Sequence, residues 1–350
     1  MRVRQVVLGV AAAMLSGCAT LGYYGQAARG QVEILLGRRA LADVIADPAS
    51  SPELRRKLAL ARDARAFAVR ELQLPDNGSY QRYTDLHRPF VVWNVFAAPA
   101  LSLAPIETCF PIVGCLSYRG YFRETRARAH ADRLAAQGLD VYVGGVAAYS
   151  TLGWFADPLL NTMLVWDDRR LVKTLFHELA HQRVYFADDT AFNESFAMAV
   201  AELGYARWRA ARGEPIGADE EERRDEALID LLIRHRDALK ALYARQDLDD
   251  TTKLARKQAQ FAALAADYAA LRAGWHGDTS YDRWMYEDMN NAKLASIATY
   301  HALVPGFLAL FAQSGQSFAE FYRRVEAMKR QTKEARAQAL DALVKEDHVS

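Results

Sequence analysis

The sequence lacks the features that mark several common classes of protein. Its 44 basic and 43 acidic residues nearly cancel and form no long basic run, so nothing in the charge favours a nucleic-acid partner. No period of 20–50 residues recurs and no low-complexity tract interrupts the chain, which argues against a solenoid and against a disordered linker. Only three cysteines are present, so a metal site built from several thiolates is not available.

A membrane-spanning run is also missing at the amino terminus, although a shorter apolar run is present. Arg2 and Arg4 precede an apolar stretch from Val6 to Leu15, and these ten residues are too few to cross a bilayer, which needs about 20. Positive charge, a short apolar run and small residues after it are the layout of a secretory signal peptide. The sequence therefore predicts a leader over residues 1–17 that is removed from the mature protein.

The predicted end of the leader carries a second signal. Residues 15–18 read Leu-Ser-Gly-Cys, which resembles the bacterial lipobox, in which the cysteine receives a lipid and becomes the first mature residue. Ala19 stands where a retention signal would place Asp. The resemblance implies that Cys18 is a lipid anchor. It also implies that the protein is held at the outer membrane of a bacterial cell envelope, facing the periplasm.

The two remaining cysteines, Cys109 and Cys115, allow one pairing. In an oxidising envelope compartment they are expected to form a disulfide, and so short a loop contributes about 2 kcal/mol in the chain-entropy treatment. A two-cysteine metal site is the alternative, but neither a histidine nor a further cysteine lies near them. The prediction is therefore a disulfide that stiffens the chain locally.

The rest of the chain predicts an α+β fold that is predominantly helical. With 51% hydrophobic residues over 350 positions it can bury a sizeable core, and one domain over residues 18–350 is expected. Residues 18–166 combine helices with a small mixed or antiparallel sheet, whereas residues 167–350 read as helix and include a long helical hairpin. The expected elements are helices over 26–46, 52–72 and 125–138, strands over 90–98, 115–122 and 139–150, and hairpin helices over 220–246 and 252–275.

The stretch HELAH at residues 177–181 carries the strongest chemical signal. No Gly or Pro interrupts residues 167–203, so the stretch is expected to lie on a helix. There His177 and His181 project from one face, about 6 Å apart at Cβ, and both imidazoles can bind one ion. Glu178 is one step round the helix, close enough to act on a water at that ion without being a ligand.

A catalytic zinc needs a third protein ligand and one open position. Because thiolates are scarce, this ligand must be a carboxylate or a further histidine. Residues 188–190 can cap a second helix, and so short a connection brings that helix back antiparallel, with Glu194 near His177 and His181. The alternative is that the histidines are hydrogen-bonded core residues and that Glu194 is an acid favoured by the helix dipole.

Two resemblances extend this interpretation. HELAHQ followed by NESFA resembles the gluzincins, zinc peptidases in which two histidines and a glutamate on the next helix hold the metal. A lipobox and the stretches LPDNGSY, YSTLGWFADPLL, DDTAFNESFA and NNAKLASIATYH are similar, over most of the mature chain, to a family of bacterial lipoproteins labelled predicted aminopeptidases. The resemblance implies a zincin-like peptidase domain and a peptide substrate. It makes His177, His181 and Glu194 the zinc ligands and Glu178 the general base.

The sequence departs from the gluzincin pattern in two places. Only twelve residues separate His181 from Glu194, fewer than in the well-known gluzincins, so the turn between the two helices must be tight. The strand GGVAAYS lacks the Gly-Ala-Met-Glu-Asn signature, whose glutamate binds a substrate's free amino group. The second departure weakens the assignment as an exopeptidase.

Two further residues are candidates for the site. Gluzincins place a Tyr or His downstream of the motif to stabilise the developing oxyanion, and Tyr300 is chosen here because it follows a polar set on an otherwise apolar helix. A core aromatic is its alternative reading. Glu202, eight residues after Glu194, either orients a zinc-bound imidazole or is a surface glutamate. The other candidates for the oxyanion are His276, Tyr281, Tyr286 and His301.

Together these patterns predict an enzyme. The leading hypothesis is a zinc-dependent peptidase, an aminopeptidase by the family resemblance, that is attached to the membrane through its N-terminal lipid and uses Glu178 to activate a zinc-bound water. The alternative is a noncatalytic envelope lipoprotein in which zinc staples the fold and the surface binds a partner. A third hypothesis is hydrolysis of a non-peptide amide, such as a cell-wall component.

Overall fold

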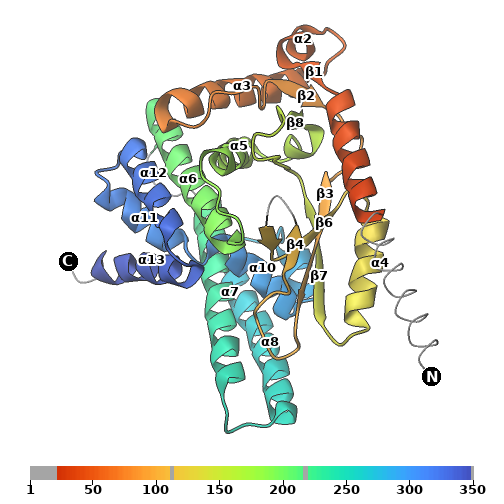
Figure 1. Ribbon diagram of the computed structural model, residues 1–350, viewed down its shortest axis with the longest axis vertical. Helices are drawn as coiled ribbons and strands as arrows, with labels where there is room; N and C mark the ends of the chain where they lie inside the picture. Colours follow the sequence, from red (N-terminus) through yellow and green to blue (C-terminus); the bar gives the residue numbers. More distant parts are fainter. Residues whose placement is uncertain (1–21, 111–113, 216–219, 348–350) are drawn as a thin grey trace, which may run out of the picture.

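The computed structural model describes residues 22–110, 114–215 and 220–347, and its fold is the predominantly helical α+β fold that the sequence predicts (Figure 1). The predicted leader and Cys18 lie outside the described residues. Within them, the strands form two three-stranded sheets and one two-stranded hairpin, and helices make up most of the rest.

Strands and helices alternate in the first half of the chain, and the second half is helical. A helix over residues 22–36 comes first. It is followed by β1 (Arg39–Ala40), α2 (Leu41–Ala46), α3 (Pro52–Leu72), β2 (Arg82–Thr84), β3 (Val92–Ala98), β4 (Thr108–Phe110), β5 (Gly114–Leu116), β6 (Arg119–Tyr121), α4 (Glu124–Ala135), β7 (Asp140–Val146), β8 (Leu159–Leu160), η1 (Asn161–Met163), α5 (Asp168–Arg183), α6 (Thr190–Ala211), α7 (Glu220–Ala244), α8 (Asp250–Ala273), α9 (Asp282–Tyr286), α10 (Asn291–His301), α11 (Val304–Gln313), α12 (Phe318–Ala327), η2 (Met328–Arg330) and α13 (Lys333–Asp347).

The single helix predicted over residues 26–46 is wrong. Its first part ends before Gly37, after which β1 pairs antiparallel with β2 and only then does α2 begin. A side chain at Gly37 would lie 2.7 Å from Cγ2 of Thr84 in β2. The pairing with a strand about 40 residues further along the chain therefore interrupts a segment whose local spacing is helical. The predicted strand 115–122 divides similarly, because β5 pairs with β4 and β6 with β3.

Strand β3 is the centre of the larger sheet, in the order β6-β3-β7, with both neighbours antiparallel. Every residue of β3 is buried because helices cover both faces of the sheet. Trp93 and Val95 pack on α4, whereas Phe96 and Ala98 pack with Ala292 of α10. A strand that is buried on both faces reads as a continuous apolar run, and this sheet connects α4 to the helices of the second half.

The main core lies among α3, α5, α6, α11 and α12, and α5 and α6 cross the middle of the molecule (Figure 1). Helices α7 and α8 form the predicted hairpin, which extends from this core and has its own apolar cluster, including Leu228, Leu232, Leu264 and Tyr268. The two helices that carry the HELAH and NESFA stretches therefore lie within the main core.

One stretch among the described residues, Asn291–Gln313, is long and apolar enough to cross a membrane, with a mean hydropathy of 1.6. The structure divides it into α10 and α11, and 56% of its most apolar window is buried within the protein. Phe307 and Leu310 belong to the main core. The stretch therefore serves as two packed core helices in this fold.

Gly306 allows α11 to approach α13 closely. A Cβ here would lie 2.7 Å from both Cβ and the carbonyl oxygen of Leu340, and this backbone cannot move independently of α13. We expect Gly306→Ala to lower the free energy of unfolding by roughly 2 kcal/mol, measured by urea denaturation. Gly274→Ala is the control, because its nearest heavy atom would be 3.6 Å away. Equal effects of the two substitutions would contradict the proposed close contact.

Candidate metal centre

Helix α5 carries the HELAH stretch through the main core. Asp167 begins the helix by accepting a hydrogen bond from the amide of Arg170 at 2.8 Å. His177, Glu178 and His181 are 7–9% exposed, and the apolar residues between and before them are fully buried. The imidazoles therefore project from a helix that is fixed by packing on several sides.

A tight turn joins α5 to α6, as the short spacing predicts. Asp188 adopts a positive φ of 67° and Asp189 caps α6, accepting a hydrogen bond from the Phe192 amide at 3.3 Å. The side chain of Asn193 closes the turn: its oxygen accepts from the Phe186 amide at 2.8 Å, and its nitrogen donates to the Phe186 carbonyl at 2.7 Å. These bonds return α6 along α5 and explain why an asparagine precedes the candidate ligand on α6.

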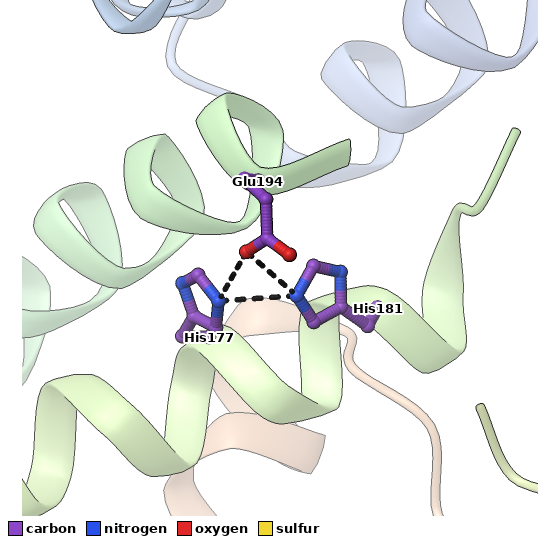
Figure 2. A group of neighbouring side chains, drawn as sticks. All are labelled: His177, His181 and Glu194. Atoms are coloured by element: carbon purple, nitrogen blue, oxygen red, sulfur yellow. Dashed lines mark hydrogen bonds and ion pairs between the residues drawn. The ribbon is translucent and has the colours of Figure 1, made fainter. Parts of the chain in front are cut away.

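The turn brings Glu194 to the two histidines, as Figure 2 shows. The Nε2 atoms of His177 and His181 are 3.0 Å apart. Oε2 of Glu194 lies 3.2 Å from the first nitrogen and 3.4 Å from the second. Ligands bound at about 2.0–2.1 Å to a tetrahedral zinc are about 3.3 Å from one another. The three atoms are therefore spaced as ligands of one small ion would be.

Hydrogen bonding alone does not account for this cluster. A neutral imidazole carries one N–H and an ionised carboxylate carries none, so at most two of the three mutual contacts can be hydrogen bonds. Nδ1 of His181 is buried and has no hydrogen-bond partner among the residues that the structure describes. A cation shared by both Nε2 atoms and Oε2 satisfies all three lone pairs at once. The residues present therefore fit a metal ion better than a hydrogen-bonded core.

The buried Glu194 carboxylate also favours a cation. Burial would raise the pKa of Glu194, but the two imidazoles outweigh it and lower the pKa to about 2. Burial would lower the pKa of His181, but the Glu194 carboxylate outweighs it and raises that pKa. Burial raises the pKa of Glu178, and the two imidazoles oppose this effect. Glu194 is thus a buried anion at neutral pH, where a weakly screened cation is attracted strongly.

Comparison with known proteins adds the family. A family model described as "Putative aminopeptidase" matches residues 22–340. The chain belongs to this family. Membership implies a peptidase and a peptide substrate, and residues 22–340 include His177, His181 and Glu194. No curated protein and no solved structure matches the chain significantly.

Two of the residues singled out from sequence lie beside the cluster. Glu178 follows His177 on α5, and the Glu194 carboxylate contributes to raising its pKa. The ring of Tyr300, on α10, stacks at 6.3 Å from the ring of His177, with an angle of 26° between the planes. Burial raises the pKa of Tyr300 well above its usual value, and Glu194 and Glu178 raise it further. The Tyr300 hydroxyl is therefore protonated at neutral pH and can donate.

Sequence reasoning missed Tyr118, which lies between β5 and β6. Burial raises its pKa well above the usual value, and Glu194 adds more than any other neighbouring group. Its ring packs at 5.3 Å from that of Phe96 in β3. The amide of Ser117 donates to Thr190 at the start of α6, at 3.3 Å, which fixes the strand turn beside α6. No local pattern gives this proximity, because it depends on a contact across 73 positions.

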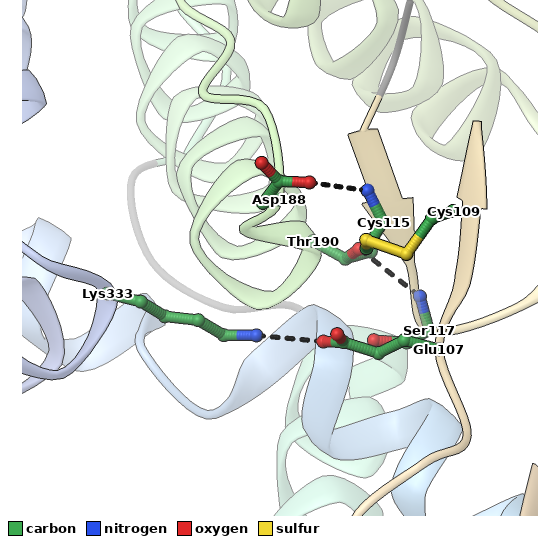
Figure 3. Close-up of a disulfide and its surroundings, with 7 residues drawn as sticks. All are labelled: Glu107, Cys109, Cys115, Ser117, Asp188, Thr190 and Lys333. Carbon is green, nitrogen blue, oxygen red and sulfur yellow. Dashed lines mark hydrogen bonds and ion pairs between the residues drawn. A yellow bond between two sulfur atoms is a disulfide. The ribbon is translucent and has the colours of Figure 1, made fainter. Parts of the chain in front are cut away.

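The predicted disulfide is confirmed and joins Cys109 in β4 to Cys115 in β5 (Figure 3). The Cys115 amide donates to Oδ1 of Asp188 at 2.7 Å, in the turn between α5 and α6. Gly114 has a φ of +78°, and a side chain there would lie 2.5 Å from the same carboxylate. The crosslinked hairpin is therefore fitted against the turn that positions Glu194, which extends its expected role of local stiffening.

Glu202 occupies a different place from the one that its spacing suggested. Its carboxylate pairs with Lys173, one turn before His177 on α5. Eight residues correspond to a rotation of about 80° around a helix, so Glu202 and Glu194 do not share one line along α6. The contact that the structure gives Glu202 is an ion pair between α5 and α6, in place of a bond to a ligand imidazole.

A buried ion pair holds the start of α6. Arg336 of α13 lies 2.7 Å from the Asp189 carboxylate, and both side chains are less than 10% exposed. We expect Arg336→Met to lower the free energy of unfolding by about 3–5 kcal/mol, because it leaves the buried charge of Asp189 without its cationic partner. Chemical denaturation measures this, with the exposed Arg330→Met as a control that changes stability by less than about 0.5 kcal/mol. A loss below 1 kcal/mol in Arg336→Met would contradict the interpretation.

Proposed function

We propose that the protein is a zinc-dependent aminopeptidase of gluzincin type, attached by a lipid on Cys18 to the outer membrane and facing the periplasm. The convergence of the two Nε2 atoms and Oε2 of Glu194 carries the proposal. Two imidazoles and one carboxylate are a common ligand set for catalytic zinc, which keeps its fourth position open. Family membership supports the peptide substrate, and the Leu-Ser-Gly-Cys stretch supports the anchor.

In this proposal, residues around the ligand cluster have separate roles in the reaction. When bound, zinc supplies a Lewis acid that lowers the pKa of water from ~15.7 toward ~7. Glu178 accepts the proton of the attacking water and delivers it to the leaving amine. Tyr300 donates a hydrogen bond to the oxyanion that develops on the scissile carbonyl. Tyr118, which also lies near the Glu194 carboxylate, is a second candidate donor. A preorganised donor of this kind lowers the barrier by about 3 kcal/mol.

Hydrolysis of matched peptides tests the proposal. The zinc-loaded protein is expected to cleave peptides with a free amino terminus and to leave their acetylated counterparts intact. A chelator should abolish the activity and added zinc should restore it. Cleavage of acetylated peptides at internal bonds would replace the aminopeptidase assignment with endopeptidase action. If the protein retains its zinc but hydrolyses no peptide, the noncatalytic alternative, in which zinc only stabilises the fold, would be favoured. Muropeptides are assayed in parallel, because their cleavage would indicate hydrolysis of a cell-wall amide.

A further inference from the structure

The helix over residues 22–36 exposes a stripe of apolar side chains. Tyr24, Ala28, Val32 and Leu36 follow one another at four-residue steps, which makes each a neighbour of the next in a stripe that turns by about 40° around the helix at each step. Tyr24 is 42%, Val32 52% and Leu36 82% exposed. The opposite side of the helix packs into the main core, and the helix lies at the edge of the molecule (Figure 1).

Three exposed arginines lie on one flank of this helix, where Arg29 adjoins the stripe. Arg29 is on the helix, and Arg123 and Arg126 are at the start of α4; together they line a hollow of about 330 Å³ between the two elements. Neither Arg29 nor Arg123 has an ion-pair partner in the described part of the chain. Glu33 also lines the hollow, but its carboxylate is bound by Arg88 at 3.1 Å. Guanidinium groups bind phosphate through two parallel hydrogen bonds.

We infer that this surface, the stripe with its flanking arginines, lies on the bilayer that holds the lipid anchor. The inference rests on the proposed anchor at Cys18. Only residues 19–21 separate that cysteine from the helix, and four Cα steps span at most about 14 Å. The helix must therefore begin close to the headgroup layer, which is about 5–8 Å thick.

The distribution of exposed side chains decides how the helix is oriented. Leu36 is about 21 Å from the first residue of the helix, and it is the most exposed member of the stripe. A helix standing upright on the membrane would leave Leu36 in water with nothing to cover it. A helix lying in the plane of the interface buries the stripe and brings Arg29, with the arginines of α4 on the same flank, toward the phosphates. The lipid supplies attachment, and the surface fixes which side of the protein faces the membrane.

Vesicle binding by a chain without lipid tests this surface separately from the anchor. The mature chain with Cys18→Ser, secreted behind a leader that is cleaved without acylation, is floated with vesicles of phosphatidylglycerol and phosphatidylethanolamine, or of phosphatidylcholine alone. We expect binding to the anionic vesicles that weakens with salt. The pair Val32→Glu and Leu36→Glu should lower the partition coefficient at least tenfold. Arg29→Gln with Arg123→Gln should lower it about fivefold per arginine.

Leu254→Glu is the matched control, because Leu254 is 41% exposed on α8, in the hairpin; it should bind as the parent does. No binding to anionic vesicles, or equal binding by the stripe variants and the control, would overturn the inference. Sedimentation showing a dimer that the stripe variants dissociate would also overturn it, since a second copy would then cover the face. If the variant with Val32→Glu and Leu36→Glu does not fold, vesicle binding by the variant with Arg29→Gln and Arg123→Gln tests the inference by itself. Mass spectrometry of the native chain tests the anchor itself, so the two failures are distinguishable.

Discussion

Replacing Glu178 with glutamine is expected to lower kcat for peptide hydrolysis by about a thousandfold while the metal remains bound. Glutamine has nearly the same shape but cannot accept the proton of the attacking water, and general-base catalysis contributes about 10²–10⁴ in rate. Glu178 projects from α5 beside the ligands and is not one of the three converging groups. Steady-state kinetics, elemental analysis and thermal unfolding of the same preparation measure the three properties together.

The control for this substitution is Glu71→Gln, which removes an exposed carboxylate at the end of α3 and should leave kcat unchanged. Two results would contradict the role of Glu178. One is a Glu178→Gln protein that retains its activity. The other is a protein that loses activity only because it has lost its metal. If the wild-type protein binds zinc but has no activity to lose, the noncatalytic alternative takes the place of the enzyme.

Removing the Glu194 carboxylate is expected to abolish the stabilisation that zinc confers. A ligand that binds only the folded protein raises its stability by about 2.7 kcal/mol at a concentration one hundred times Kd. Glu194→Gln keeps the shape of the side chain but removes the anion that both imidazoles contact. We expect its zinc affinity to fall by at least about 100-fold, because even outer groups around a metal contribute 10–100-fold.

Thermal unfolding with and without zinc measures this effect, and isothermal titration gives the affinities. Glu202→Gln is the matched control on the same helix, since its carboxylate pairs with Lys173; it should keep the full response to zinc. An equal response in Glu194→Gln and the wild-type protein would show that the metal, if bound, is held elsewhere. A lost response in Glu202→Gln would restore the role that its spacing first suggested.

The parts of the site that could be predicted are those set by local geometry. Four-residue spacing on a helix fixes the relation of His177 to His181, and a short connection forces the next helix back, so Glu194 could be placed from sequence. Tyr118 could not, because it reaches the cluster through a sheet turn and a hydrogen bond to α6. The two readings of Glu202 stayed open from sequence because a spacing of eight residues only approximates one helix face.

In the fold, too, the elements set by local spacing could be predicted, and those set by long-range contacts could not. The limits of α3 and the pairing of α7 with α8 follow from breakers and apolar spacing, and both are observed as predicted. The interruption at Gly37 follows from pairing between β1 and β2, which are far apart in sequence. A helical spacing in residues 26–46 carries no information about pairing with β2, so this tertiary contact determined that β1 is a strand.

The metal content and coordination of the purified wild-type protein show whether His177, His181 and Glu194 hold zinc. Elemental analysis and zinc X-ray absorption on one sample give the stoichiometry and the atoms bound. We expect one zinc per chain, with two imidazole nitrogens and one carboxylate oxygen bound at about 2.0–2.2 Å and one further oxygen or nitrogen atom in the remaining position. A protein that binds no divalent metal under saturating conditions, or whose bound zinc has no imidazole ligand, would contradict this expectation.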